Sequence, residues 1–256
     1  MESRVPQSTA AGPSPVRVRV APCPAAPGCV PAENEVFAWV VDLARPPVRT
    51  DDLFRRLTAE EQARALRYKI AKAREQFTIG RGLLRGLLAE CFGASPDRIG
   101  LTYLPSGKPV LTDASTGLHF NVTHTDGTAV IALARRRVGV DVEIVRPVRD
   151  ADGLVQRYFS PAECAAYRAL PEQHKEAGFF RGWTTKEAVI KAAGATVACL
   201  ADFDVELNPA RAPRVHTVRA APLAGDGWAL AEWTANGHVA IALALEGTGA
   251  LGVEKE

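Results

Sequence analysis

Alternating hydrophobic and polar positions predict a set of short strands along the chain. The clearest alternation runs through Val138–Ile144, where aliphatic residues are separated by Gly139, Asp141 and Glu143. This two-residue period is typical of a strand with one buried face, and it places both carboxylates together on the opposite face. Other strands are predicted in the ranges 36–41, 129–134, 203–207, 215–219, 228–233 and 238–245.

Helical patterns separate these strands, and two of them begin with a capping box. The first opens at Thr58–Glu61 and continues to about Gly93, with a break expected at 69–72. The second opens at Ser160–Glu163, and a further helix is predicted over Phe179–Gly194. In a capping box the first hydroxyl accepts from an orphan backbone amide and the glutamate reaches back, which fixes where a helix starts. Glycine just after the last helical position is a natural end.

Two apolar stretches of similar sequence hint at an internal duplication. The segment 129–134 reads Ala-Val-Ile-Ala-Leu-Ala, and the segment 239–244 reads Val-Ala-Ile-Ala-Leu-Ala. Each closes a strand-rich section in its own half of the chain. We also predict a hairpin in which Arg135–Arg137 forms the turn between the strands 129–134 and 138–144. This hairpin would bring His124 and the two carboxylates into one sheet.

The composition is that of an ordinary globular chain without a strong preference for polyanions. Of its 256 residues 47% are hydrophobic and 23% are charged, and the formal net charge is +2. No apolar run is long enough to span a bilayer, and prolines interrupt any signal-peptide core near the N-terminus. The five cysteines are scattered, without the spacing of a zinc site or a disulfide framework. We therefore expect a cytoplasmic protein.

The two ends of the chain differ from the rest. Residues 1–34 are rich in Pro and Ala and lack helical periodicity, which favours a disordered leader. Residues 247–256 are expected to form a frayed tail. The folded part is therefore predicted to begin near residue 35 and to end near residue 246.

Several side chains are candidates for chemistry, although each also has an ordinary structural explanation. Asp141 and Glu143 repel each other unless a cation lies between them, so they form either a solvated strand face or half of a Mg²⁺ site. His124 stands between two threonines, and this group suits either a structural role or contact with a phosphate. Glu187 and Lys191 have the spacing of an ordinary helical ion pair.

Basic residues in the first predicted helix form a second group of candidates. Arg67, Arg74 and Arg81 recur every seven residues and therefore share a helix face, which Arg85 extends by one turn. Such a face is either solvated or an anion-binding wall. Lys108 lies in a turn that contains glycine and proline, and this turn would hold its ammonium group in a position suited to an anion.

Four motifs in this order resemble the Sfp-type 4′-phosphopantetheinyl transferases. They are G-K-P at 107–109, F-N-x-T-H-T at 120–125, G-x-D-x-E at 139–143 and W-x-x-K-E-A-x-x-K at 183–191. The resemblance covers roughly residues 36–245. It implies a pseudo-dimeric α+β fold of two similar halves, each with a small antiparallel sheet and a long helix. The expected division is residues 35–136 for the N-terminal half and 137–246 for the C-terminal half.

The resemblance also implies a reaction and its partners. Enzymes of this type transfer the 4′-phosphopantetheine arm of coenzyme A to a serine of an apo carrier protein. The transfer depends on Mg²⁺ and releases adenosine 3′,5′-bisphosphate. We expect the partners to be apo acyl carrier and peptidyl carrier proteins of polyketide or nonribosomal peptide synthesis. An internal pseudo-dimer predicts a monomer, and no nucleic acid or membrane partner is expected.

The expected site residues follow from this resemblance and from the needs of phosphoryl transfer: neutralised charge, an activated nucleophile and a stabilised leaving group. Asp141, Glu143 and Glu187 are expected to hold Mg²⁺. The catalytic set comprises Glu187 as general base, Lys191 at the departing phosphate and His124. The residues expected to bind coenzyme A are Arg64, Arg81, Lys108, Thr123, His124, Lys186 and Lys191.

The sequence departs from the family pattern at two points. Thr123 and Thr125 replace serines that are common there, and this change keeps both hydroxyls. Thr196 and Val197 stand where a second glycine often follows the last motif. The loop after the last predicted helix, and with it the preference for a carrier, is therefore left open.

Two other functions are compatible with parts of the sequence. The same acids could act on water, which would make the protein a Mg²⁺-dependent hydrolase of coenzyme A or of a nucleotide pyrophosphate. The basic helix could belong to a nucleic-acid-binding module, but the low net charge and the lack of aromatic residues among the arginines count against it. Carboxylates alone do not distinguish Mg²⁺ from Mn²⁺.

Overall fold

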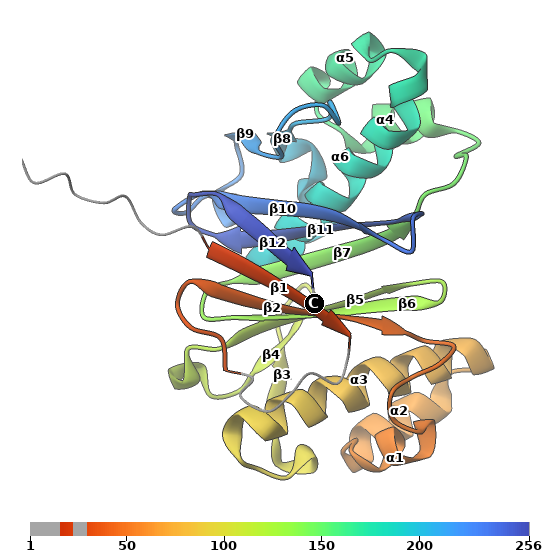
Figure 1. Cartoon of the computed structure of the whole chain (residues 1–256), viewed down its shortest axis with the longest axis vertical. Helices are drawn as coiled ribbons and strands as arrows, with labels where there is room; N and C mark the ends of the chain where they lie inside the picture. Colours follow the sequence, from red (N-terminus) through yellow and green to blue (C-terminus); the bar gives the residue numbers. More distant parts are fainter. Residues whose placement is uncertain (1–15, 23–29, 256) are drawn as a thin grey trace, which may run out of the picture.

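The fold is known from a computed structural model, which describes residues 16–22 and 30–255. Figure 1 shows its layers: a group of helices, a sheet, a second sheet and a second group of helices. None of the described helices is long and apolar enough to cross a membrane. Both chain halves contribute one sheet and one group of helices.

The first half contains three strands joined antiparallel in the order β2-β6-β5. They are β2 (Glu35–Asp42), β5 (His119–Thr125) and β6 (Thr128–Ala134). Between β2 and β5 the chain forms α1 (Thr50–Arg55), α2 (Ala59–Arg67), α3 (Ala71–Phe92) and a hairpin of β3 (Leu101–Tyr103) and β4 (Pro109–Leu111). Short 3₁₀ turns lie at Pro96–Arg98 and Ala114–Thr116.

The second half repeats this arrangement element by element. Its strands β7 (Val138–Ile144), β10 (Trp228–Ala235) and β11 (Val239–Glu246) are antiparallel in the order β7-β11-β10. Between β7 and β10 lie α4 (Ala151–Tyr158), α5 (Pro161–Ala169), α6 (Glu172–Ala193) and a hairpin of β8 (Phe203–Val205) and β9 (Val215–Val218). Short 3₁₀ turns lie at Val197–Asp202 and Ala221–Leu223. The predicted α+β fold of two similar halves is confirmed.

The core is divided among the layers by the alternation along each strand. In β7, Val138, Val140 and Val142 face the other sheet and are buried between the two sheets. The alternate positions face α6, and Gly139 allows the closest approach to that helix. The carboxylate face that the sequence predicts is therefore present, but a helix covers it in place of solvent.

The two capping-box starts and the two glycine ends are confirmed, whereas the last predicted helix begins at Glu172, seven residues before the predicted Phe179. Thr58 and Ser160 both make complete capping boxes, and the first helical pattern is broken at residues 68–70, which overlaps the predicted break at 69–72. The two long helices α3 and α6 have 22 residues each, and each ends at a glycine in the left-handed conformation, Gly93 with φ 58° and Gly194 with φ 70°. Glycine adopts this conformation without steric cost, so it ends both helices sharply.

A buried ion pair ties the second and third helices of each half together. Glu61 of the first capping box accepts from Arg85 Nε at 2.5 Å and from Arg81 Nη1 at 3.2 Å. Glu163 of the second accepts from Lys186 Nζ at 2.7 and 2.8 Å. Arg85 and Lys186 both occupy the fifteenth position of their helices, as the bounds of α3 and α6 show. The two halves therefore share not only the order of their elements but also this buried ion pair.

Both chain ends differ from the expectation. Val16–Pro22 forms a strand, β1, which pairs in parallel with β2 and with β12 (Leu251–Lys255). The disordered leader over 1–34 and the frayed tail over 247–256 were therefore wrong for these segments. Valine alternates with arginine in β1, and Val18 is fully buried, so a strand period was present within the proline-rich composition. Residues 1–15 and 23–29 of the predicted leader lie outside the described residues.

The predicted hairpin of the strands 129–134 and 138–144 was also wrong. β6 and β7 belong to different sheets, and Arg135–Arg137 carries the chain from one sheet to the other. Arg136 Nη1 donates to the backbone oxygen of Glu246 at 2.8 Å, and Arg137 Nη2 donates to the Glu246 carboxylate at 2.5 Å. These contacts hold the crossing beside the end of β11, which is the true partner of β7.

We predict that Gly139→Ala destabilises the protein. An added Cβ would lie 2.1 Å from the Ala188 carbonyl oxygen and 2.3 Å from the Ala192 nitrogen, and backbone atoms of a helix cannot move aside cheaply. The expected loss in the free energy of unfolding is about 1–3 kcal/mol, as for other overpacked cores. Urea denaturation measures it. Gly252→Ala is the matched control, because nothing lies within 4 Å of its added Cβ. Equal stability of the two variants would contradict the close approach of β7 and α6.

Candidate active site

The site forms where one edge of each sheet meets, between β5 and β7. Asn121 of β5 accepts a hydrogen bond from the Val140 backbone nitrogen at 2.8 Å, and both atoms are buried. This contact places Thr123 beside Asp141, with Thr123 Oγ1 3.3 Å from Asp141 Oδ1. Asn121 is part of the motif F-N-x-T-H-T, but the sequence assigns it no role of its own. Its role becomes visible only when two edges from different sheets are known to be neighbours.

Asp141, Lys191 and Thr123 form a connected group at this junction. Lys191 Nζ of α6 donates to Asp141 Oδ1 at 2.5 Å and to Thr123 Oγ1 at 3.2 Å. Asp141 is 4% exposed, and its other oxygen, Oδ2, is buried without a hydrogen-bond partner among the described residues. A buried carboxylate oxygen without a partner is costly, so this atom is a candidate for a ligand.

Glu143 and Glu187 lie beside Asp141 and feel its charge. Burial raises the pKa of Glu143, and the Asp141 and Glu187 carboxylates raise it further, against the opposing pull of Lys191. Burial also raises the pKa of Glu187, and here Lys191 opposes the rise while Asp141 adds to it. These three neighbouring carboxylates form a region of concentrated negative charge, which a cation would relieve.

The residues at this junction fit Mg²⁺. The described residues contain no group of three His, Cys, Asp or Glu side chains already arranged around one point as a metal site. Mg²⁺, however, is usually held by only one or two carboxylates together with waters and substrate phosphates. The partnerless Asp141 Oδ2 and the mutual repulsion of the carboxylates suit such a partial set of ligands.

A pocket of about 260 Å³ lies next to this junction, on the first-half side. Arg64 and Arg81 reach into it from α2 and α3, and their guanidinium groups lie near the rings of Phe77 and Tyr103, at 5.0–5.8 Å from the ring centres. His124, at the end of β5, also lines it. Two cations held over aromatic faces form a surface suited to an anion that carries a flat ring.

Comparison with known proteins gives the family. Residues 137–244 match the model of the 4'-phosphopantetheinyl transferase superfamily, and residues 48–136 match that of 4'-phosphopantetheinyl transferase, N-terminal. The chain is 35% identical over 229 residues to the 4'-phosphopantetheinyl transferase HetI of Nostoc sp. strain PCC 7120, which covers 88% of this chain and 94% of that protein. The chain belongs to the 4′-phosphopantetheinyl transferase superfamily. A 4'-phosphopantetheinyl transferase of Bacillus subtilis is 28% identical over 175 residues, or 68% of this chain and 77% of that protein.

The resemblance inferred from the four motifs is therefore confirmed. The protein is a 4′-phosphopantetheinyl transferase, and enzymes of this class take coenzyme A as a substrate and act on carrier proteins. The motifs F-N-x-T-H-T and G-x-D-x-E supply the two strand edges that meet at the junction. The fourth motif lies on α6 and supplies Glu187 and Lys191.

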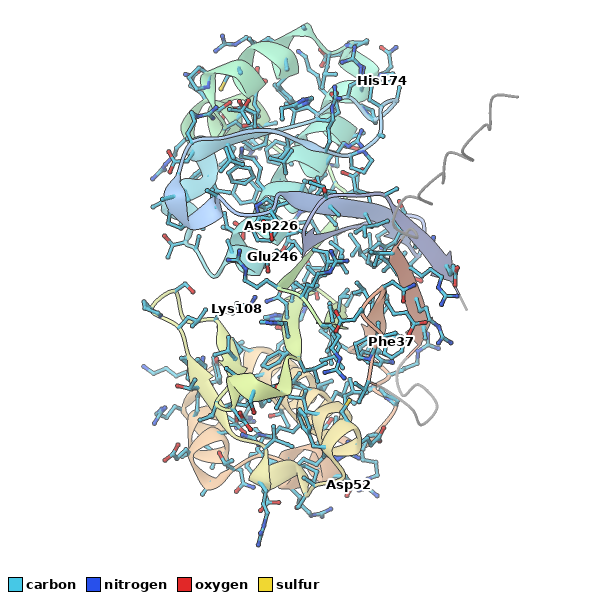
Figure 2. The ribbon with its side chains drawn as sticks, turned by 90° about the vertical axis from the view of Figure 1, so that its left-hand side faces the viewer. Phe37, Asp52, Lys108, His174, Asp226 and Glu246 are labelled. Atoms are coloured by element: carbon cyan, nitrogen blue, oxygen red, sulfur yellow. The ribbon has the colours of Figure 1, made fainter. Side chains whose placement is uncertain are left out.

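Lys108 has a different place in this transferase from the one that the sequence suggested. Its ammonium group donates to the backbone oxygens of Lys191 at 2.6 Å, Val138 at 3.0 Å and Ala192 at 3.4 Å. These contacts use all three of its hydrogens at the C-terminal end of α6, which counts against the expected contact with a coenzyme phosphate. Burial lowers the pKa of Lys108 to about 8. Figure 2 shows this lysine at the boundary between the two halves.

Lys186 also lies outside the group that faces the junction. It is fully buried, and its ammonium group is enclosed by the Glu163 carboxylate and the Phe203 backbone oxygen. These internal partners count against the prediction that Lys186 binds coenzyme A. A signal was present in the sequence, because Lys186 shares a helix face with Gly182 and Ile190 rather than with Glu187.

The arginines that recur every seven residues do not form a common wall. Arg81 lines the pocket, whereas Arg85 is 2% exposed and bound to Glu61. Arg67 lies on α2, and Arg74 lines a separate pocket near α1. The break between α2 and α3 separates Arg67 from the other three arginines. Along α3 the contacts with Glu61 enclose Arg85, while Arg74 lies near the start of the helix. Phe77 and Tyr103 belong to the pocket but were not singled out, because an aromatic residue in isolation predicts only packing.

We predict that Lys186→Ala lowers stability without altering coenzyme binding. The substitution would leave the Glu163 carboxylate buried without its cation, and breaking such a pair costs about 3–5 kcal/mol. Urea denaturation should show this loss, and the double variant Glu163→Gln/Lys186→Met should recover part of it. The KM for coenzyme A of the folded variant should stay unchanged. Lys69→Ala, at an exposed position, is the control. A raised KM with normal stability would restore the coenzyme-binding role.

Proposed function

We propose that this protein transfers the 4′-phosphopantetheine arm of coenzyme A to a serine hydroxyl of an apo acyl or peptidyl carrier protein, in a Mg²⁺-dependent reaction that releases adenosine 3′,5′-bisphosphate. The observation that supports this most is the buried Asp141 carboxylate, which binds Lys191 through one oxygen and has no described partner at the other. It lies between a pocket suited to an anion and two further carboxylates.

Asp141, Glu143 and Glu187 are the residues that would hold Mg²⁺ in this proposal. Bound there, the ion would neutralise charge on the coenzyme pyrophosphate during phosphoryl transfer. Carboxylate oxygens suit Mg²⁺ and Mn²⁺ alike, so activity assays should compare both.

Glu187 is the proposed general base for the carrier serine. A base must be ionised at the working pH, but it accepts a proton better when its pKa is above that of an exposed carboxylate. Burial raises the pKa of Glu187 in this direction, and Lys191 opposes the rise. Glu187 would therefore take the serine proton as the hydroxyl oxygen attacks phosphorus.

Lys191 is the proposed partner of the departing phosphate. It lies one helical turn after Glu187 on the same face of α6, so both groups meet the same reacting centre. Its ammonium group is anchored by Asp141 and by the Thr123 hydroxyl. This anchoring supports a fixed positive charge where the leaving oxygen gains negative charge, which is the arrangement that stabilises a transition state. Thr123 positions this charge, and its hydroxyl is also available to a coenzyme phosphate.

Arg64, Arg81 and His124 form the proposed coenzyme-binding set. The two guanidinium groups would bind the adenosine phosphates, and the nearby rings of Phe77 and Tyr103 offer faces on which the adenine could stack. Burial lowers the pKa of His124, and the Lys191 charge lowers it further. His124 is therefore neutral near pH 7 in the free protein, and we propose that it contacts a coenzyme phosphate rather than transferring protons.

We further propose that the protein works as a monomer in the cytoplasm and serves polyketide or nonribosomal peptide synthesis. A single chain supplies both strand edges of the junction, so a second copy is not needed to complete it. Cys164 and Cys199 carry free thiols in the part of the chain that the structure describes, which suits a reducing compartment. The proposed carriers rest on the resemblance to the Sfp type.

The test is the intact mass of a purified apo carrier protein after incubation with this protein, coenzyme A and Mg²⁺. We expect a gain of one phosphopantetheine arm, which a chelator prevents. Asp141→Asn should lower the rate at least about 100-fold. It would weaken the ion pair that holds Lys191 in place, and it would remove a charged ligand from the proposed metal site. Asp51→Ala, on an exposed part of α1, should leave the rate unchanged. Consumption of coenzyme A without a gain in carrier mass would favour the hydrolase. Full transfer by Asp141→Asn would contradict the proposed metal site.

A second prediction concerns the pH dependence of coenzyme binding. The pKa of His124 is lowered from 6.5, so the imidazole is neutral above that pH and gains a proton as the pH falls below it. A protonated imidazole attracts phosphate more strongly, so the affinity for coenzyme A should rise as the solution becomes more acidic in this range. Calorimetric titrations at several pH values measure this rise in affinity. The phosphates of coenzyme A also change protonation with pH, and the same titrations on His124→Asn measure that contribution alone. Parallel curves for the two proteins would rule out contact between His124 and a phosphate.

A further inference from the structure

A pocket of about 480 Å³ lies between the two sheets, at the end of this layer where β1, β2, β10 and β12 finish and β6 begins. Its inner wall includes Val20, Val40 and Trp233, which belong to the core between the sheets or pack against it. This volume is within the range of small-molecule sites, about 300–1,000 Å³. None of the residues proposed for catalysis or for coenzyme binding lines this pocket.

Trp233 carries a buried hydrogen-bond donor without an acceptor. The residue is 8% exposed, and its indole nitrogen Nε1 is buried with no hydrogen-bond partner among the described residues. The other tryptophan of β10, Trp228, is satisfied, because its Nε1 donates to the Leu223 backbone oxygen at 2.9 Å. An indole N–H can only donate, and leaving a buried donor unpaired costs about 1–3 kcal/mol. The pocket beside Trp233 has room for a ligand atom that would accept this hydrogen bond.

The mouth of the pocket has polar side chains on strand faces that are apolar deeper in the layer. Side chains alternate between the two faces of a strand, so every second residue of β2, β6 and β12 faces the other sheet. Deeper in the layer these inward positions hold valines in all three strands: Val40, Val130 and Val253. Two residues nearer the mouth, the same strand faces carry Asp42, Thr128 and Lys255.

Lys255 supplies a positive charge at this mouth that no acid neutralises. Its ammonium group donates to the Thr234 backbone oxygen of β10 at 3.2 Å, and no carboxylate in the described part of the chain pairs with it. Asp42, in contrast, already has its partners, because it accepts from Arg45 Nε at 3.0 Å and from the Ala44 backbone nitrogen at 2.9 Å. The balance of charge at the mouth therefore favours an anion.

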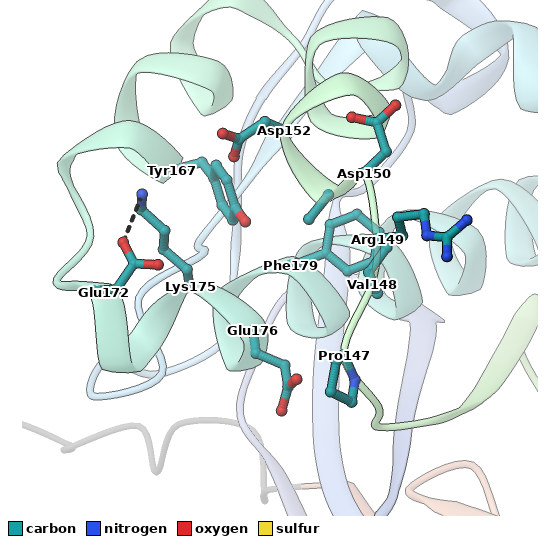
Figure 3. Close-up of a pocket in the computed structure, with 11 residues that line it drawn as sticks. Pro147, Val148, Arg149, Asp150, Asp152, Tyr167, Glu172, Lys175, Glu176 and Phe179 are labelled. Atoms are coloured by element: carbon teal, nitrogen blue, oxygen red, sulfur yellow. Dashed lines mark ion pairs between the residues drawn. The ribbon is translucent and has the colours of Figure 1, made fainter.

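The pocket drawn in Figure 3 lacks this combination of an unpaired donor and a free charge. It lies between the segment 147–152 and the start of α6, and charged side chains surround Phe179 there. None of the buried side-chain atoms that lack a partner among the described residues belongs to it. Its lysine, Lys175, is already paired with Glu172 at 2.9 Å. The pocket beside Trp233 is therefore the better-supported binding site.

We propose that the pocket beside Trp233 binds a small aliphatic carboxylate. The carboxylate oxygens would accept hydrogen bonds from the Trp233 indole N–H and from the Lys255 ammonium group. The hydrocarbon stem would lie against Val20 and Val40, and burial of apolar surface favours this placement. An inorganic anion would leave these valines in contact with water. A cation would meet Lys255 and an acid, Asp42, that is already occupied.

Binding of octanoate, measured by calorimetry on the full chain, tests this proposal. We expect saturable binding of one molecule. Trp233→Phe keeps an aromatic ring but removes the donor, and Lys255→Met keeps the stem but removes the charge. Each variant should bind octanoate about tenfold more weakly, because each loses one hydrogen bond to a charged ligand. Lys69→Met, at an exposed position in the first half, is the control and should bind as the unaltered protein does.

Further measurements locate the ligand and test its chemistry. Octanoate should change the tryptophan fluorescence of the unaltered protein and of Lys69→Met, but not that of Trp233→Phe. 1-Octanol has the same stem without the charge and should bind at least about tenfold more weakly. Lys255→Met changes an exposed residue near the chain end, so it should keep the urea denaturation midpoint of the unaltered protein. Absence of saturable octanoate binding, or equal affinity of Lys255→Met and the unaltered protein, would overturn the proposal.

Discussion

Each half of this transferase depends on a buried carboxylate that is held by a cation from its long helix. Glu61 and Glu163 are 7% and 2% exposed, and their partners Arg85 and Lys186 are equally enclosed. Loss of one partner would leave the other as an uncompensated buried charge, so the pair acts as a fixed joint between a short helix and a long one. Because Lys186 directly precedes Glu187 in α6, its ion pair with Glu163 also fixes where Glu187 lies relative to β7.

A second constraint acts between the halves. Lys108, from the turn between β3 and β4, donates to backbone oxygens at the C-terminal end of α6 and to one in β7. Helix ends of this kind carry partial negative charge and unpaired carbonyls, so a buried ammonium group is a suitable cap. The cap holds the helical turn that contains Lys191, and Asn121 holds the neighbouring strand edges together. The first half thus positions the charged groups of the second.

The sequence predicted local structure well, and it predicted long-range contacts poorly for a physical reason. The alternation in Val138–Ile144 and the two capping boxes are properties of neighbouring residues, and the structure confirms them. The cation that pairs with a capping-box glutamate depends instead on which helix packs against it. A local sequence pattern does not predict that packing. For this reason the positive charge of Lys108 and Lys186 predicts contact with a phosphate, whereas in the structure both bind acceptors within the protein.

The apparent repeat of apolar strands illustrates the same limit. The segments 129–134 and 239–244 do form the equivalent central strands β6 and β11. When their letters are aligned, however, Ile131 matches Ile241, and these residues face different layers. Ile131 packs toward α3, whereas Ile241 is buried between the sheets. The equivalent positions are therefore displaced by one residue, because apolar residues on both faces of a buried strand leave its register undefined.

The duplication also explains why the chain is expected to contain one catalytic centre rather than two. Counted back from Gly93 and Gly194, the helix position of Glu187 is occupied in α3 by Gly86, and that of Lys191 by Glu90. The first half therefore lacks both the proposed base and the proposed cation. At the position of Arg81, which lines the anion-suited pocket, α6 has Gly182. The two halves share their buried joint but differ at the positions that face the junction, so each can supply only one part of the proposed site. A complete site therefore requires the two halves to be in contact, and the hydrogen bonds of Asn121 and Lys108 hold them together.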